Sequence, residues 1–165
     1  MQSSTSAPIV SDYEASATDY ALALTAGYRF ASAGPLTYGV EGNLDFVSGK
    51  TMSDSGVDAC TGTSPSWCTV DIAMRLRGTL GTDLASGNRL TASLGAIVVR
   101  GKTENGPGNY LDTTGRGVSV GVAWERVSDQ MPVRIDLNYD SIRTDDQPAY
   151  ERDLDMVGLR ISYMF

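Results

Sequence analysis

The sequence predicts an all-β protein, a transmembrane antiparallel up-and-down β-barrel of eight strands that forms one domain over residues 1–165. Three observations predict this fold. Apolar residues alternate with polar or small residues in seven segments of the chain. Short and long connections alternate between those segments. The chain closes on an amphipathic segment, 156–165, that ends in an aromatic residue, as the closing strand of a bacterial outer-membrane barrel does.

The first three segments each have one uninterrupted apolar face. Residues 18–30 alternate tyrosine, leucine and phenylalanine with alanine, threonine, glycine and arginine. Residues 36–46 alternate leucine, tyrosine, valine and phenylalanine with threonine, glutamate, asparagine and aspartate. Residues 70–81 place valine, isoleucine, methionine and leucine opposite aspartate, arginine and threonine. A period of two is the side-chain period of a strand, so each segment predicts one strand.

The last four segments follow the same rule. Residues 90–100 alternate leucine, alanine and valine with threonine, serine, glycine and isoleucine, and residues 117–126 alternate valine and tryptophan with serine, glycine, alanine and glutamate. Residues 133–140 alternate valine, isoleucine, leucine and tyrosine with arginine, aspartate and asparagine. Segment 156–165 sets valine, leucine, isoleucine, tyrosine and phenylalanine against glycine, arginine, serine and methionine. Seven strands are therefore explicit in the pattern.

An eighth strand is expected ahead of residue 18, because single-chain bacterial barrels have even strand numbers. Ala7, Ile9 and Ser11 are expected to begin it, with Pro8 at a strand end or an unpaired edge, since proline cannot donate to a ladder. Residues 1–5 have neither a basic start nor an apolar core. We therefore expect Met1 to be a start residue added to a mature chain whose export signal was omitted.

The connections and the aromatic residues predict an orientation. The short connections are 31–35, 85–89 and 128–132, and the long ones, rich in Gly, Asp, Ser and Thr, are 47–69, 101–116 and 141–154. Short periplasmic turns and long extracellular loops are the layout of outer-membrane barrels, so Phe165 is expected on the periplasmic side. Two aromatic girdles result, with Tyr28, Phe30, Tyr38, Trp124, Tyr163 and Phe165 at the short-turn end and Tyr20, Phe46 and Tyr139 at the other.

The polar faces of the predicted strands carry charges of both signs. The expected inward set is Arg29, Glu41, Asp45, Asp71, Arg75, Arg77, Glu125, Arg134, Asp136, Asp140 and Arg160. Paired charges are tolerable in an interior where lone ones are too costly, so we expect an ion-paired network that plugs the lumen. A water-soluble β-sandwich would also alternate, but its solvated face would more often carry lysine, glutamate and threonine.

Composition excludes several classes of function. Lys and Arg number 13 against 20 Asp and Glu, a net charge of −7, which disfavours nucleic acid as a partner. The longest apolar run, near 94–99, is too short for a transmembrane helix. The chain has no histidine, which removes the usual catalytic base, so we expect neither catalysis nor a cofactor.

The predicted outer loops hold the remaining candidate sites. Cys60 and Cys68 are spaced wrongly for a zinc site, and a local disulfide is expected rather than two free cysteines. Trp67, within that loop, is interpreted either as an exposed adhesive contact or as a residue that packs back on the barrel rim. The acids of segment 141–155 could bind Ca²⁺ or share divalent ions with lipopolysaccharide, or be solvated charge alone: Asp145, Asp146, Glu151, Asp153 and Asp155. Tyr150 is a further surface-loop candidate.

Five stretches in this order resemble the small opacity/porin-family outer-membrane β-barrels. They are residues 39–46 (GVEGNLDF), 76–81 (LRGTLG, departing from the family's LRGRLG at Thr79), 117–125 (GVSVGVAWE), 134–139 (RIDLNY, with Asp136 where the family usually has glutamate) and the closing 157–165. The resemblance covers residues 18–165. It implies a bacterial outer-membrane location and a role in adhesion, host interaction or membrane integrity, and it does not imply a pore.

These observations predict a function and its partners. We expect a monomeric, non-catalytic outer-membrane barrel with a side-chain-plugged lumen, acting in surface interaction or envelope integrity. The alternative is a narrow-pore channel for ions or small solutes, although eight strands enclose an interior that side chains fill. Expected partners are the lipid bilayer, lipopolysaccharide, the barrel-assembly machinery through the C-terminal strand, and a surface ligand through the outer loops.

Overall fold

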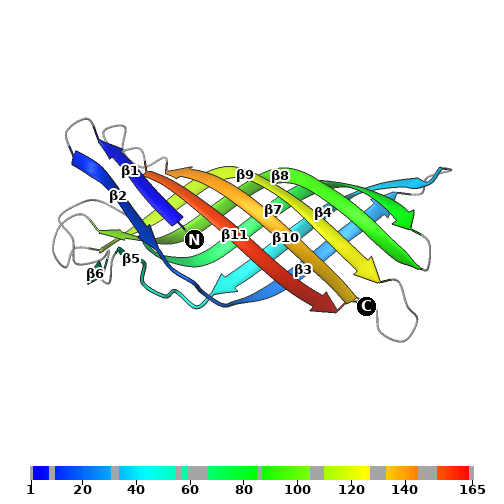
Figure 1. The fold of residues 1–165 in the computed structure, drawn as a ribbon, viewed down its shortest axis with the longest axis horizontal. Coiled ribbons are helices and arrows are strands. Elements are labelled where there is room, and N and C mark those ends of the chain that lie inside the picture. The colour runs from blue at the N-terminus through cyan, green and yellow to red at the C-terminus, as the bar shows by residue number, and fades with distance from the viewer. Residues whose placement is uncertain are drawn as a thin grey trace.

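The computed structural model shows one antiparallel sheet (Figure 1). It describes residues 2–7, 10–30, 34–54, 57–58, 67–84, 87–104, 110–126, 133–144 and 152–163. Within these residues the regular structure is all strand, which confirms the predicted all-β class. None of the described segments forms a helix long and apolar enough to cross a membrane.

Seven long strands follow one another up and down the sheet, each paired with its neighbours in the sequence. They are β3 (Ala21–Phe30), β4 (Leu36–Val47), β7 (Trp67–Leu84), β8 (Asn88–Glu104), β9 (Tyr110–Arg126), β10 (Val133–Thr144) and β11 (Arg152–Tyr163). All six ladders between them are antiparallel. Each of the seven predicted segments therefore forms a strand, in the predicted up-and-down order.

The sheet is not closed. Within the described residues no ladder joins β3 to β11, the two ends of the seven-strand run. The predicted eighth strand is replaced by a hairpin of β1 (Gln2–Ala7) and β2 (Val10–Ser16), in which Ala7 pairs with Val10 beside the turn. β1 pairs with β11 only over residues 152–155, so the hairpin extends one end of the sheet.

Two short strands complete the sheet beside that hairpin. β5 (Ser53–Asp54) pairs with β2 through Ser16 and Ser53, and β6 (Val57–Asp58) pairs with β5. They lie at the same end of the molecule as β1 and β2 (Figure 1).

Several strands continue well beyond the alternating segments. β8 reaches Glu104, β9 begins at Tyr110, and β10 reaches Thr144, so much of the predicted loops 101–116 and 141–154 is strand. Backbone pairing continues there through polar residues, for example between Lys102 and Asp112. The alternation of apolar residues marks only the part of each strand with an apolar outer face, because the ladder itself needs no particular side chain.

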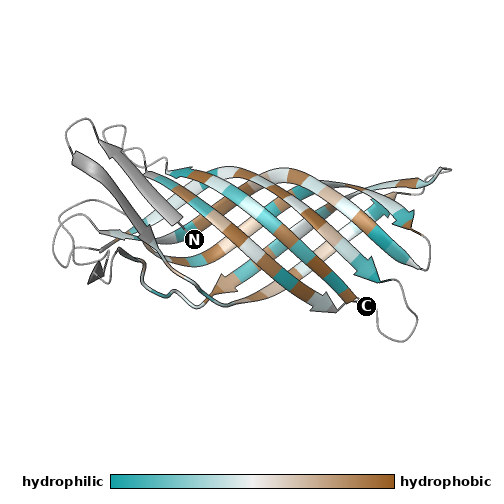
Figure 2. Cartoon of the chain, viewed as in Figure 1, coloured by the Kyte–Doolittle hydropathy of each residue, from teal (hydrophilic) through white to brown (hydrophobic). Residues whose placement is uncertain are grey.

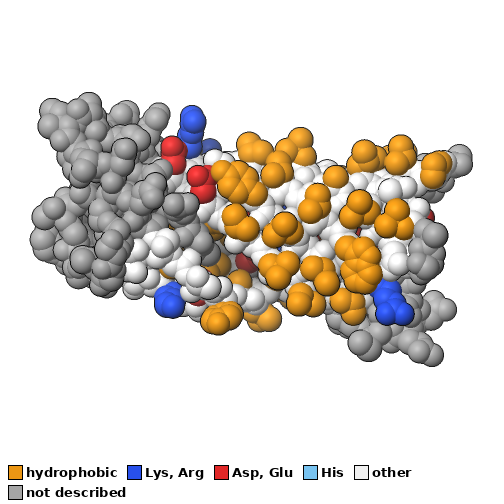
Figure 3. All heavy atoms as spheres, in the orientation of Figure 1, with side chains coloured by type: hydrophobic (Ala, Val, Ile, Leu, Met, Phe, Trp, Pro, Cys, Tyr) orange, Lys and Arg blue, Asp and Glu red, His pale blue; other side chains and the backbone are white. Residues whose placement is uncertain are grey.

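The two faces of the sheet differ in polarity, and the polar face is the inner one. Along β10, Arg134, Asp136, Asn138 and Asp140 are buried, whereas the residues between them, Ile135, Leu137 and Tyr139, are exposed. Apolar residues alternate with polar ones along the strands (Figure 2), and apolar side chains cover much of the visible surface between the two ends (Figure 3). Charged residues are seldom fully buried in proteins unless they are paired, so a polar interior of this kind needs ion pairs.

A bulge in β7 changes which residues face inward. Val70 pairs with Gly101 and Ile72 with Arg100, so Asp71 is the additional residue. The extra residue shifts the period-two pattern, and Val70, predicted to face outward, is buried. Asp71, predicted to face the interior network, accepts a hydrogen bond from Thr69 Oγ1 at 3.2 Å instead.

Most of the buried apolar residues form one cluster near the long connections. This apolar cluster contains Met52, Trp67, Val70, Ala73, Ile97, Val99, Ile142, Leu154 and Met156. Met52 belongs to the segment between β4 and β5, and its N–H donates to the carbonyl oxygen of Cys68 at 2.8 Å. The interior therefore has two layers, with apolar residues toward the long connections and charged residues toward the short connections.

Candidate functional site

The charged residues of the interior form two groups of ion pairs that connect strands across the sheet. In the first group Arg134 of β10 binds Glu41 of β4 at 2.5 Å and Asp136 at 2.6 Å. Arg77 of β7 binds the same two carboxylates, at 2.6 and 3.1 Å. Because β4 and β10 are not sheet neighbours, these contacts show that the sheet curves until the two strands face each other.

Glu125 of β9 extends the first group toward the short connections. It accepts from Arg134 Nη1 at 3.3 Å and from Arg29 Nη2 of β3 at 2.5 Å. The Glu125 side chain is fully buried, whereas 46% of the Arg29 side chain is exposed. Arg29 therefore lies where the charged interior meets the open side of the sheet.

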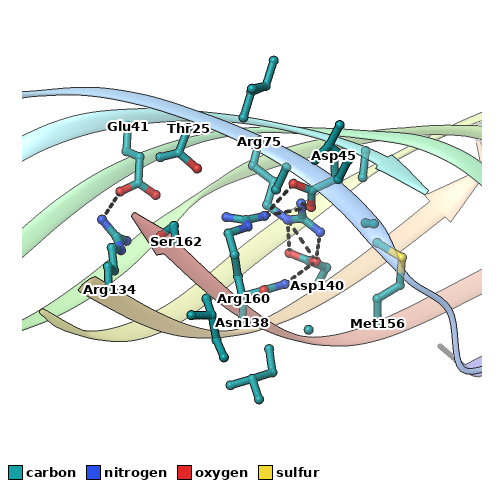
Figure 4. A pocket seen from close by; sticks show the side chains of 18 of the residues that line it. Thr25, Glu41, Asp45, Arg75, Arg134, Asn138, Asp140, Met156, Arg160 and Ser162 are labelled. Atoms are coloured by element: carbon teal, nitrogen blue, oxygen red, sulfur yellow. Dashed lines mark hydrogen bonds and ion pairs between the residues drawn. The ribbon is translucent and has the colours of Figure 1, made fainter. Parts of the chain in front are cut away.

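The second group is centred on Arg75 of β7. Its guanidinium holds Asp140 of β10, with Nη2 at 2.6 Å from Oδ2, and it also pairs with Asp45 of β4. Arg160 of β11 binds Asp45 from the other side at 2.7 Å. Figure 4 shows these side chains converging from opposite strands.

Asn138 also belongs to the second group, although it carries no charge and is not in the predicted inward charge set. Its Nδ2 donates to Asp140 Oδ2 at 2.8 Å, and the residue is buried. Asn138 lies two residues from both Asp136 and Asp140, and this spacing indicates from the sequence that its side chain shares their inward face of β10.

The described interior network is electrically balanced. Its members are the arginines 29, 75, 77, 134 and 160 and the acids Glu41, Asp45, Glu125, Asp136 and Asp140. Ten of the eleven predicted residues are thus brought together, and Asp71 is the exception. Charges buried to this degree are stable only while each has a partner, so loss of one member leaves an uncompensated charge.

Glycines facing the interior make room for the large charged side chains. A Cβ placed on Gly121 would lie 2.8 Å from Ser93 Oγ and 2.9 Å from Arg77 Nη1. A Cβ on Gly158 would lie 2.7 Å from Asn138 Oδ1. Both glycines therefore occupy positions where the polar network takes the volume that a side chain would need.

A cavity of about 1250 Å³ lies on the open side of the sheet. Both edge strands line the cavity. The lining includes Tyr20, the residue before β3, together with residues 21–29 of β3 and 156–162 of β11. Arg75 and Asp140 form part of its inner wall. Figure 4 shows the network side chains within it. Most inward residues of β3 are exposed here, whereas most of those of β8 and β10 are buried.

Asp19, just before β3, anchors that strand to the segment after β4. Its carboxylate accepts from the N–H of Tyr20 and the N–H of Lys50, each at 2.8 Å, and from the Ser48 hydroxyl. Partial burial raises the pKa of the Asp19 carboxyl, but these hydrogen bonds outweigh it and hold the pKa below its usual range.

The structure describes only some of the predicted loop residues. Cys68 is disulfide-bonded and buried, and Cys60, the other cysteine of the chain, lies outside the described residues. Trp67 has no exposed surface, so its interpretation as an exposed contact is wrong; it packs back into the apolar cluster. The loop candidates Asp145, Asp146, Tyr150 and Glu151 lie outside the described residues. The described part of the chain contains no group of side chains suited to a metal ion.

Comparisons of this chain with protein-family models, curated proteins and solved structures found no match. Its functional interpretation therefore depends on the geometry of the sheet and the network.

Proposed function

We propose that this chain is a bacterial outer-membrane protein whose curved sheet lies in the lipid bilayer as a transmembrane β-barrel. The observation that supports this most strongly is the reversed polarity of the sheet. Leu76, Leu94 and Leu159 on the outer face are 60–70% exposed, whereas Arg77, Asp136 and Asp140 inside are at most 1% exposed. Such an outer face gains stability in a hydrocarbon solvent and loses it in water.

The dimensions of the outer face support the same proposal. On β8 the outward apolar residues run from Leu90 to Val98, about nine residues, the length of a tilted transmembrane strand. Three aromatic residues gather near the short connection 31–35, where Phe30 contacts Tyr28 and Tyr38 with ring centroids at 5.2 and 5.4 Å. Aromatic girdles of this kind mark the interfaces of transmembrane barrels.

The interior favours a surface or envelope role over conduction. The balanced ion pairs cross the interior, and the apolar cluster fills it toward the long connections. We therefore propose a plugged barrel that acts in surface interaction, adhesion or envelope integrity without catalysis. Its partners would be the bilayer, lipopolysaccharide, the barrel-assembly machinery and a ligand of the long connections. This role matches the resemblance to the opacity/porin family in residues 39–46 and 157–165.

A narrow-pore channel is the second candidate, because a cavity of about 1250 Å³ reaches Arg75 and Asp140. Planar-bilayer recordings distinguish the two. The plugged barrel predicts no reproducible single-channel steps. Steps that change in size when Arg75 is replaced by methionine would establish the channel instead.

One pair of substitutions tests the membrane location directly. Leu94→Arg places a charge in the middle of the apolar band, and Leu111→Arg places it beyond the band, next to Asp112 on β9. In a bilayer the first change should cost about 2–4 kcal/mol of folding free energy and the second about 0–1. Both are measured by urea titration in lipid vesicles.

A protein whose surface faces water would tolerate both changes within about 0.5 kcal/mol. It would also stay monodisperse without detergent and fail to float with vesicles. Equal tolerance of Leu94→Arg and Leu111→Arg would therefore refute the proposed membrane location.

A further inference from the structure

The two edges of the sheet face each other across the cavity without pairing. β3 and β11 are the first and last of seven strands whose directions alternate, so they run in the same direction. A direct ladder between them would be parallel. A single additional strand of the opposite direction could instead pair antiparallel with both edges. Unpaired edges of this length are strong acceptors for an extended chain.

The ladder between β1 and β11 indicates the path of such a strand. β1 is antiparallel to β11, with Gln2 opposite Asp155 and Thr5 opposite Arg152. Its first paired residue, Gln2, is the one nearest the cavity, and the N-terminal end of β1 lies beside β11 (Figure 1). Chain continued backward from Gln2 in the same register would pass along residues 157–162, the part of β11 that lines the cavity.

We propose that the gap between β3 and β11 is an acceptor site for one extended polypeptide segment, which enters in line with β1 and pairs antiparallel with both edges. We call this gap the seam. The backbone pairing does not depend on the proposed membrane location. Only the expected apolar outer face of the segment rests on that proposed function.

The charges around the seam define the inward face of the segment. Arg160 of β11 is already paired with Asp45, and Arg29 of β3 with Glu125. An additional charge would have no partner among the described residues and would disturb a balanced network. Beside these arginines the inward residues of the edges are small: Ala23, Thr25 and Gly27 on β3, and Gly158 and Ser162 on β11. The segment should therefore present small, uncharged residues inward.

The outer face of the segment should be apolar. Its neighbours on that face are Leu22 and Leu24 of β3 and Val157, Leu159 and Ile161 of β11, all 60–72% exposed. A sequence with both properties exists elsewhere in the chain. In β9, residues 117–124 carry Val118, Val120, Val122 and Trp124 outward and Ser119, Gly121 and Ala123 inward. A copy of this segment is a suitable probe for the seam.

The experiment joins Gly-Val-Ser-Val-Gly-Val-Ala-Trp, the copy of residues 117–124, directly ahead of Met1 of the full chain. Counting back from the pairing of Gln2 with Asp155, the added tryptophan falls opposite Val157 and an added glycine opposite Arg160. The matched control has one further glycine between the added tryptophan and Met1. This insertion turns every added side chain to the opposite face while leaving the eight copied residues unchanged.

Amide hydrogen exchange measures the outcome. We expect exchange in β3 and in residues 157–163 to slow by about tenfold or more with the in-register extension, and to remain at the rate of the unextended chain with the control. Amides of β8, which pairs on both sides, report that all three chains are folded. Equal protection by the two extensions, or protection by neither in folded chains, would overturn the proposal.

Two further results would also overturn it. If a second copy of the chain covers the seam, the unextended chain will be dimeric by light scattering, and its β3 protection will fall on dilution. If the same peptide added in trans protects β3 as well as the tethered extension does, entry in line with β1 is wrong. The Leu94→Arg comparison tests the bilayer separately, so failure of either proposal can be recognised on its own.

Discussion

Replacement of Arg75 by methionine should be among the most destabilising changes in the interior. The Arg75 side chain is 5% exposed and pairs with Asp140, which is fully buried, and with Asp45. Asp45 would keep Arg160, but among the described side chains Asp140 would keep only the amide of Asn138. Breaking a buried pair from one side costs about 3–5 kcal/mol, because the other charge stays buried without compensation.

The pair Arg75→Met and Asp140→Asn separates this cause from loss of packing. If the cost comes from the uncompensated carboxylate, the double variant should recover much of the stability lost in Arg75→Met, with a coupling energy of about 1–3 kcal/mol. Arg100→Met is the control, because Arg100 and Asp112 form an exposed pair with side chains 62% and 68% accessible. Exposed pairs of this kind contribute little to stability.

Urea unfolding in detergent micelles, followed by tryptophan fluorescence, measures five chains: the parent, Arg75→Met, Asp140→Asn, the double variant and Arg100→Met. The expected order of stability places Arg100→Met with the parent chain, then the double variant, then Arg75→Met. Costs that simply add in the double variant would refute the role of Arg75 as a neutralising partner. So would a loss below about 1 kcal/mol in Arg75→Met, since that is the range of an exposed pair.

Three further predictions concern other parts of the molecule. Gly121→Val should cost about 1–3 kcal/mol by urea unfolding, because the added carbons meet Ser93 and the Arg77 guanidinium; Gly78→Val, where a Cβ has 3.8 Å of space, is the control. Asp19→Asn should lower the free energy of unfolding at pH values above about 3.9, the pKa of this carboxyl in the unfolded chain. It should have no effect once the pH falls below the lowered pKa of the carboxyl in the folded protein, and a loss independent of pH would contradict this. Reduction of the Cys68 disulfide should speed hydrogen exchange near the start of β7 and leave that of β10 unchanged, and uniform acceleration would show a wider role.

Much of the interior network could be predicted from the sequence because side-chain direction in a strand is a local property. On β10 an arginine, two aspartates and an asparagine recur every second residue, so their common face needed no tertiary information. The partners of each charge could not be predicted. Arg75 pairs with Asp140, 65 residues away, only because the sheet curves until β7 faces β10.

The errors have local causes as well. The bulge at Asp71 moves Val70 inward and takes Asp71 out of the network, and no residue in 70–72 announces it. Trp67 is buried because Met52 and Ile142 join it in the apolar cluster, and these residues come from segments predicted to be loops. The expected eighth strand rests on parity, whereas residues 2–7 and 10–16 pair with each other as β1 and β2 at one end of the sheet.

The sequence by itself determined the seven strands, their order and the polarity of their two faces, because alternation with a period of two acts within each strand. Only the tertiary structure decided the ion-pair partners, the layering of apolar cluster and charged network, and the open seam between β3 and β11. These features depend on how strongly the sheet curves and on which edges meet. That is a property of long-range pairing, and no local period of the sequence encodes it.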